Sequence, residues 1–146
     1  MADGNYITTA QLNDATARQQ NLWKNAAGTV TQSFLDADRD EAEQLIDTFI
    51  GHRYAVPVTD ASAVVLLRGM VVDLVLYKGY RRQGDGEVSE TIQTGFENTV
   101  ERLKDIRDGR MKLTGVAESQ DAESPEAQIF ATANTPKFTE SNLDRY

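Results

Sequence analysis

The chain has 146 residues, a length that indicates one domain with room for a short appendage, and its formal net charge is −8. Its excess of carboxylates disfavours a phosphate-binding surface, because such surfaces are built from Lys and Arg. There is no cysteine and a single histidine, His52, so disulfides, thiolate metal sites and histidine-based zinc sites are excluded. No basic segment followed by an apolar run opens the chain, so no signal peptide is expected.

The first expected helix begins at Thr8 or Thr9, which are good N-cap residues, and runs to about Gln20. Trp23, the only tryptophan, is expected to cover the edge of the core. Residues 28–33 then suggest a loop or a short extended piece.

A second helix is predicted to begin within residues 36–40, where acidic side chains would suit the positive end of the helix dipole. Apolar residues recur at helical spacing after it, which indicates one stripe facing the core: Ala42, Leu45, Ile46, Phe49 and Ile50. The residue before a proline disfavours helix, so Val56, which precedes Pro57, should be extended.

Residues 60–80, DASAVVLLRGMVVDLVLYKGY, are the most apolar stretch of the chain. Between Val64 and Tyr77, three residues are neither apolar nor aromatic: Arg68, Gly69 and Asp73. A helix that is apolar most of the way round is buried on several sides. At 1.5 Å per residue the run spans about 20 Å, short of the about 30 Å of a bilayer core. We therefore predict the central helix of a small all-α bundle of about four helices, with no membrane contact.

Local chemistry suggests how this central helix begins and how its acid is held. Asp60 or Ser62 would cap its N-terminus. Asp73 is expected to pair with a cation such as Arg68 or Arg53, and loss of one partner of a buried pair typically costs about 3–5 kcal/mol.

The last expected helix covers residues 88–108 and follows a turn-rich loop, RRQGDGEVSE. Gly109 stands where a C′ glycine would end it, and Leu113 could fold back onto the bundle. We assign residues 1–113 to a helical domain.

Residues 114–146 differ in composition and are predicted to form an extended C-terminal arm. The segment is rich in small and polar residues and lacks helical periodicity, which is also typical of a disordered tail. Spaced apolar anchors favour an arm that orders against a partner: Ile129, Phe130, Phe138, Leu143 and Tyr146.

Sites for chemistry are scarce. One histidine cannot supply a catalytic triad, and neither a nucleophile elbow nor a phosphate loop occurs. Asp36, Asp38 and Asp40 fit positions 1, 3 and 5 of an EF-hand loop, but the glycine at position 6 and the glutamate at position 12 are missing. An acidic helix start is the better interpretation, and the Arg81-Arg82 pair is interpreted as surface charge.

Several stretches follow the pattern of a known family. Residues 6–12, YITTAQL, show its aromatic, Thr/Ser and leucine opening, and residues 46–58, IDTFIGHRYAVPV, show its Ile-Asp, Arg-Tyr and proline. The chain thereby resembles the Mu-like phage neck proteins, small helical head-tail adaptors. Residues 13–35 and Thr99 depart from the pattern. The resemblance marks these residues as a structural motif: Asp47, Arg53, Tyr54, Pro57, Asp73, Tyr77 and Gly109.

This resemblance implies a non-enzymatic virion protein at the head-tail junction, present in the host cytoplasm during assembly and needing no cofactor. Its implied partners are the portal, a downstream neck or tail-completion protein, and further copies of itself in a ring of about twelve. Duplex DNA would pass through the ring, and an acidic wall would repel its phosphates. The arm anchors would contact a neighbour, the portal or the next neck protein.

Two other classes of function fit the composition. A small acidic helical binding module or regulator, acting on a single protein partner, would share the bundle and the charge. An enzyme using paired carboxylates ranks last, because acid–base catalysis needs perturbed pKa values that a solvated acidic face does not provide.

Overall fold

The structure, a computed structural model, describes residues 3–84 and 87–119. Its helices are α1 (Thr9–Ala15), the 3-10 helix η1 (Ala17–Trp23), α2 (Gln32–Ile50), α3 (Ala61–Gln83) and α4 (Glu90–Arg107). In this part of the chain extended pairing is limited to two isolated bridges, Lys24 with Val30 and Tyr54 with Glu118. The predicted small all-α bundle is confirmed.

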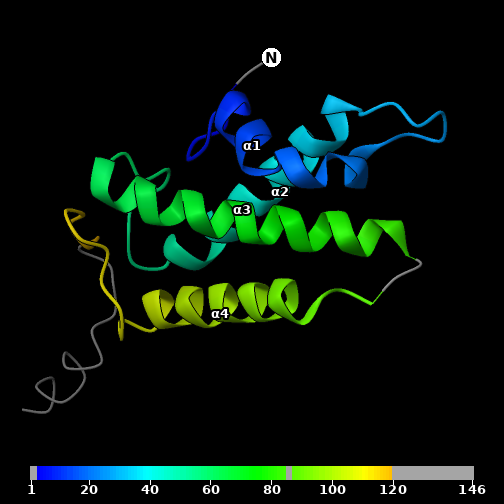
Figure 1. Ribbon diagram of the computed structural model, residues 1–146. Helices are drawn as coiled ribbons and strands as arrows, with labels where there is room; N and C mark the ends of the chain where they lie inside the picture. The colour runs from blue at the N-terminus through cyan, green and yellow to red at the C-terminus, as the bar shows by residue number, and fades with distance from the viewer. Residues whose placement is uncertain (1–2, 85–86, 120–146) are drawn as a thin grey trace, which may run out of the picture.

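Helix α3 occupies the middle of the bundle (Figure 1). It contacts α2, α4 and η1, and α2 also contacts α4. One face of α3 supplies much of the core: Ala63, Leu67, Met70, Val71, Leu74, Val75 and Gly79. Full burial of a Leu, Val or Met side chain contributes roughly 1.5–3 kcal/mol, so this face is the main source of cohesion. Val65, which is 63 % exposed, shows that one side of α3 stays open.

The ends of the helices follow local capping chemistry. The side chain of Thr8 accepts a hydrogen bond from the Gln11 backbone amide, and the Thr8 backbone amide donates to the side-chain oxygen of Gln11, which forms a capping box. Asp60 caps α3 by accepting from the amides of Ser62 and Ala63. Gly109 has a φ of 77°, so it ends α4 in the left-handed conformation that suits glycine. These three predicted boundaries are confirmed.

Two boundaries differ from the sequence prediction. Helix α1 ends at Ala15, and the chain then tightens into η1, where Gln19 departs from helical angles. Helix α2 begins at Gln32, so its first turn holds no acidic residue. The acids at 36–40 lie inside α2, and the dipole argument for its start was therefore wrong.

Trp23 lies within the core instead of covering its edge. Its side chain is fully buried, and its Nε1 donates to the Asp38 carboxylate over 2.8 Å. A Cβ at position 79 would lie 2.8 Å from the Trp23 ring, so Gly79 is the residue that lets η1 and α3 approach each other. Among residues 3–84 and 87–119, none of the helices has the length and apolarity to cross a membrane.

Candidate functional site

At one end of the bundle, a group of residues that we call the clasp holds the exit of α4 against the end of α2; its members are Arg53, Tyr54, Gly109, Leu113 and Glu118. The Tyr54 hydroxyl accepts a hydrogen bond from the Leu113 amide over 3.1 Å. Arg53 pairs with Glu118 at 3.2 Å. A Cβ on Gly109 would lie 2.6 Å from the Arg53 guanidinium, so only glycine leaves room for this side chain. Arg53 and Tyr54 of the Arg-Tyr motif thus hold the segment after α4 against the turn that follows α2.

Residues just past residue 113, the predicted end of the helical domain, also contact the bundle next to the clasp. The Ser119 amide donates to the Arg53 carbonyl over 2.7 Å, and Val116 packs against the core. Contacts of the helical domain therefore continue to residue 119. The boundary after residue 113 stays a prediction, because the rest of the arm lies outside the described residues.

Asp47 holds the N-terminal segment. The Tyr6 hydroxyl donates to the Asp47 carboxylate and accepts from the Val58 amide at 3.3 Å. Burial, reinforced by the hydrogen bond to Asp47, raises the pKa of Tyr6 well above its ordinary value. Tyr6 therefore stays a neutral donor that joins α2 to the Pro57 turn.

Asp73 has a different partner from the one expected. Its carboxylate accepts a hydrogen bond from the Thr99 hydroxyl of α4 over 3.1 Å. The two cations predicted for it are engaged elsewhere: Arg53 with Glu118, and Arg68 with the Tyr6 carbonyl. Burial raises the pKa of Asp73, against opposing effects of the Thr99 hydrogen bond and the charge of Arg102. The predicted pairing with Arg53 or Arg68 was wrong, because Thr99 faces Asp73 across the helix interface.

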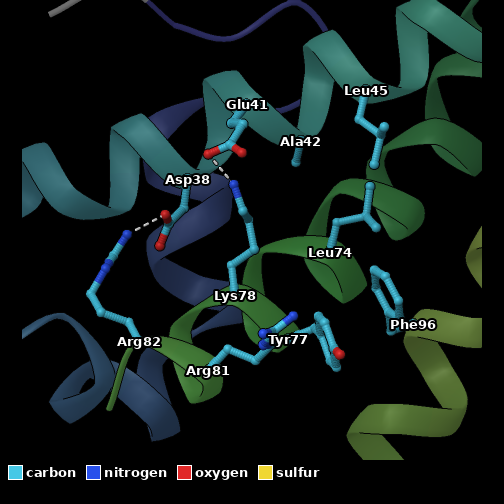
Figure 2. A pocket seen from close by; sticks show the side chains of 10 residues that line it. All are labelled: Asp38, Glu41, Ala42, Leu45, Leu74, Tyr77, Lys78, Arg81, Arg82 and Phe96. Atoms are coloured by element: carbon cyan, nitrogen blue, oxygen red, sulfur yellow. Dashed lines mark hydrogen bonds and ion pairs between the residues drawn. The ribbon is translucent and has the colours of Figure 1, made fainter. Parts of the chain in front are cut away.

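At the opposite end of the bundle the three long helices leave an open groove of about 480 Å³ (Figure 2). We call it the α2/α3/α4 groove. It is lined by Asp38, Glu41, Ala42 and Leu45 of α2, by Leu74, Tyr77, Lys78, Arg81 and Arg82 of α3, and by Phe96 of α4.

The apolar part of the groove is aromatic. The Tyr77 and Phe96 rings stack with their centroids 3.9 Å apart and an angle of 11° between their planes. Leu45, on the facing helix, is 38 % exposed. A half-buried aromatic pair and an exposed leucine that converge on one hollow are typical of a surface that receives an apolar side chain from a partner.

The polar part of the groove carries two ion pairs that cross from α3 to α2. Lys78 pairs with Glu41, and Arg82 pairs with Asp38, as Figure 2 shows. Asp38 is 2 % exposed and is held from its other side by Trp23. Arg82 lies at the surface but also neutralises a buried carboxylate. This corrects the interpretation of the Arg81-Arg82 pair as surface charge alone.

Arg81 differs from Lys78 and Arg82, the other basic residues of the groove, in its interactions. Its guanidinium lies 5.9 Å from the centroid of the Tyr77 ring. Within residues 3–84 and 87–119, Arg81 forms no ion pair with a carboxylate. It is thus the cation of the groove that remains available to an acidic partner.

Sequence reasoning singled out Tyr77 but missed the groove around it. Its walls come from positions 38–45, 74–82 and 96, whose proximity depends on how the helices pack. The predicted interface residues form a second group: Ile129, Phe130, Phe138, Leu143 and Tyr146. All of them lie outside the described residues, so their role stays a prediction.

The described residues show no cluster of three or more His, Cys, Asp or Glu side chains that could hold a metal ion. His52 is exposed in the turn after α2. The three acids of the EF-hand comparison are spread around a helix, and Asp38 is engaged by Trp23 and Arg82.

A search of curated proteins finds no match. The family described as Bacteriophage Mu, Gp36 matches residues 5–132, a span that includes the clasp, the groove and the start of the arm. The predicted family is thereby confirmed: this chain belongs to the Bacteriophage Mu Gp36 family of phage proteins.

Proposed function

We propose that this protein is a non-enzymatic head-tail connector, a neck adaptor that forms a ring between the portal and the tail of a tailed phage. The observation that carries the proposal is the family match over residues 5–132, together with the resemblance to phage neck proteins. On this proposal the protein is a part of the virion and is present in the host cytoplasm during assembly.

The charge of the chain supports this role. The chain has a net charge of −8, and an acidic wall in the proposed ring would repel the phosphates of DNA passing through its channel. Such a wall favours sliding over binding, because cationic contacts to phosphates are what make DNA adhere.

The surface of the bundle also supports it. Arg, Tyr and Phe are enriched where proteins meet, and the α2/α3/α4 groove presents Arg81, Tyr77 and Phe96 together. Ring contacts join two unlike surfaces of successive copies, and they close only at a set rotation. We expect the groove at one end of the bundle and the predicted arm, whose first residues lie at the other end, to be two such surfaces.

The test is to remove the protein from an infection with a stop codon early in its gene. We expect DNA-filled heads and complete tails that stay separate, and adding the purified protein to that lysate should restore infectious particles. Joined particles in the depleted lysate would contradict the proposal.

A second experiment separates the connector from the alternative, a small acidic binding module acting on one protein partner. A connector is present in purified particles and is retained with the portal. A binding module would be absent from particles and would remain a monomer or dimer at all concentrations.

A further inference from the structure

The described part of the chain ends at the opposite end of α3 from the α2/α3/α4 groove. The last described residue, Ser119, is bonded to Arg53 beside the end of α2, whereas the groove surrounds the last turns of α3. Figure 1 shows this separation: the yellow segment after α4 lies near the start of α3, and α3 ends at the other side of the bundle.

The groove offers an apolar hollow beside an available cation. Leu45, Tyr77 and Phe96 provide the hollow. Arg81 provides the charge, since within the described residues it lacks a carboxylate partner. An occupant that matches both features needs a large apolar side chain close to acidic residues.

The first part of the arm has this composition. Asp121, Glu123 and Glu126 precede the apolar pair Ile129-Phe130, and residues 120–130 contain no Lys or Arg. The family match reaches residue 132 and so includes the whole of this segment.

The arm is long enough to reach a neighbouring copy. Residues 120–130 alone span up to about 36 Å when extended, and residues 120–146 up to about 90 Å. Along α3, the distance from Asp60, next to the clasp, to Lys78 in the groove is about 27 Å at 1.5 Å per residue.

We propose that residues 120–130 of each copy dock in the α2/α3/α4 groove of the next copy, with Phe130 on the Tyr77–Phe96 surface and the acidic residues near Arg81. This inference rests on the proposed ring, because a ring needs two unlike surfaces that fit each other. An arm that folded into its own groove would cover both surfaces at once and leave neither for a neighbour.

The test uses the absence of cysteine, so that each introduced thiol is unique. The double variant Gln93→Cys with Ala131→Cys, which keeps Phe96 and Phe130 in place, is oxidised mildly, as purified full-length protein and in purified particles, and run on a non-reducing gel. Docking between neighbours gives a ladder of linked chains, because each copy is joined to the next.

Two matched controls accompany it. Val65→Cys replaces Gln93→Cys in the first, since Val65 is on α3 outside the groove and is 63 % exposed. This variant should give no ladder. Arg81→Glu, added to the double variant in the second, should abolish the ladder by reversing the charge next to the arm.

The inference is overturned if the link forms within one chain, which gives a monomer of altered mobility, or if Ala131→Cys links to the portal instead. It is also overturned if neither sample gives a ladder. A reducing gel of the same particles, which shows whether the protein is present in them, tests the proposed function separately. Particles that contain the protein without the ladder leave the connector role standing and remove only the docked arm.

Discussion

The two ends of α3 belong to one apolar helix but have different surroundings. Around its beginning, the clasp is closed: Tyr54 and Leu113 are 2 % and 3 % exposed. Around its end, the α2/α3/α4 groove is open, and Leu45 is 38 % exposed. The comparison shows that the packing of the neighbouring helices decides which part of an apolar helix is surrounded by buried side chains and which part borders an open surface. Substitutions in the clasp should therefore reduce mainly the stability of the fold, and substitutions in the groove should reduce mainly assembly.

The largest difference should come from the two tyrosines. Tyr54→Ala empties a buried site and leaves the Leu113 amide without its acceptor, so we expect a loss of about 3–5 kcal/mol in the free energy of unfolding. Tyr77→Ala removes a stacked pair in the groove and should cost roughly 0.5–1.5 kcal/mol beyond its lost burial. Urea unfolding of both variants measures this, and equal losses would contradict the contrast.

Two glycines sharpen the same comparison. Gly109 and Gly84 both have a positive φ, so alanine at either position should cost about 1–2 kcal/mol in backbone strain. Gly84 has open space around it, whereas a Cβ at Gly109 would displace the Arg53 guanidinium from Glu118. Gly109→Ala should therefore lower the thermal midpoint more than Gly84→Ala. The reverse order would show that the clasp is loosely packed.

Asp73, between the two ends, gives a pH dependence. Its pKa is raised in the folded state, so the folded chain holds the proton more tightly than the unfolded chain. The stability that this proton provides is complete below the ordinary pKa of 3.8 and is lost as the pH rises through the folded value. Asp73→Asn removes this loss, so its thermal midpoint should gain on the wild type as the pH rises from 3.8 towards neutrality.

The outcome that contradicts this prediction is a constant difference between the two midpoints across that pH range. Thr99→Val is the matched control. It removes the hydroxyl that donates to Asp73, and it should destabilise the protein most where Asp73 is ionised.

The smallest effect on stability is expected in the groove wall. Leu45→Ala should change the free energy of unfolding by less than about 0.5 kcal/mol, because the side chain is already partly in water. The same variant should join heads to tails poorly, as measured by the titre of infectious particles. Full joining with unchanged stability would show that the groove has no partner.

The sequence predicted most of the fold because local chemistry determines helix ends. Thr8, Asp60 and Gly109 act as the caps that their residue types suggest. The central place of α3 was predicted for a different reason: a helix that is apolar most of the way round can be buried only by other helices.

What the sequence did not predict depends on contacts between distant residues. The acids at 36–40 suggested a helix start, but Asp38 instead serves as the buried partner of Trp23 and Arg82. Thr99 lies 26 positions from Asp73, so its role could be seen only after α3 and α4 were packed. The groove has the same origin, because no periodicity in one helix records where two others leave a gap.

The central claim is that this chain is a ring component of the phage neck. A reconstruction of the purified particle at the head-tail junction tests it most directly. We predict a ring of this helical bundle between portal and tail, of about twelve copies, with α3 recognisable in each. A junction built wholly from other chains would contradict the account.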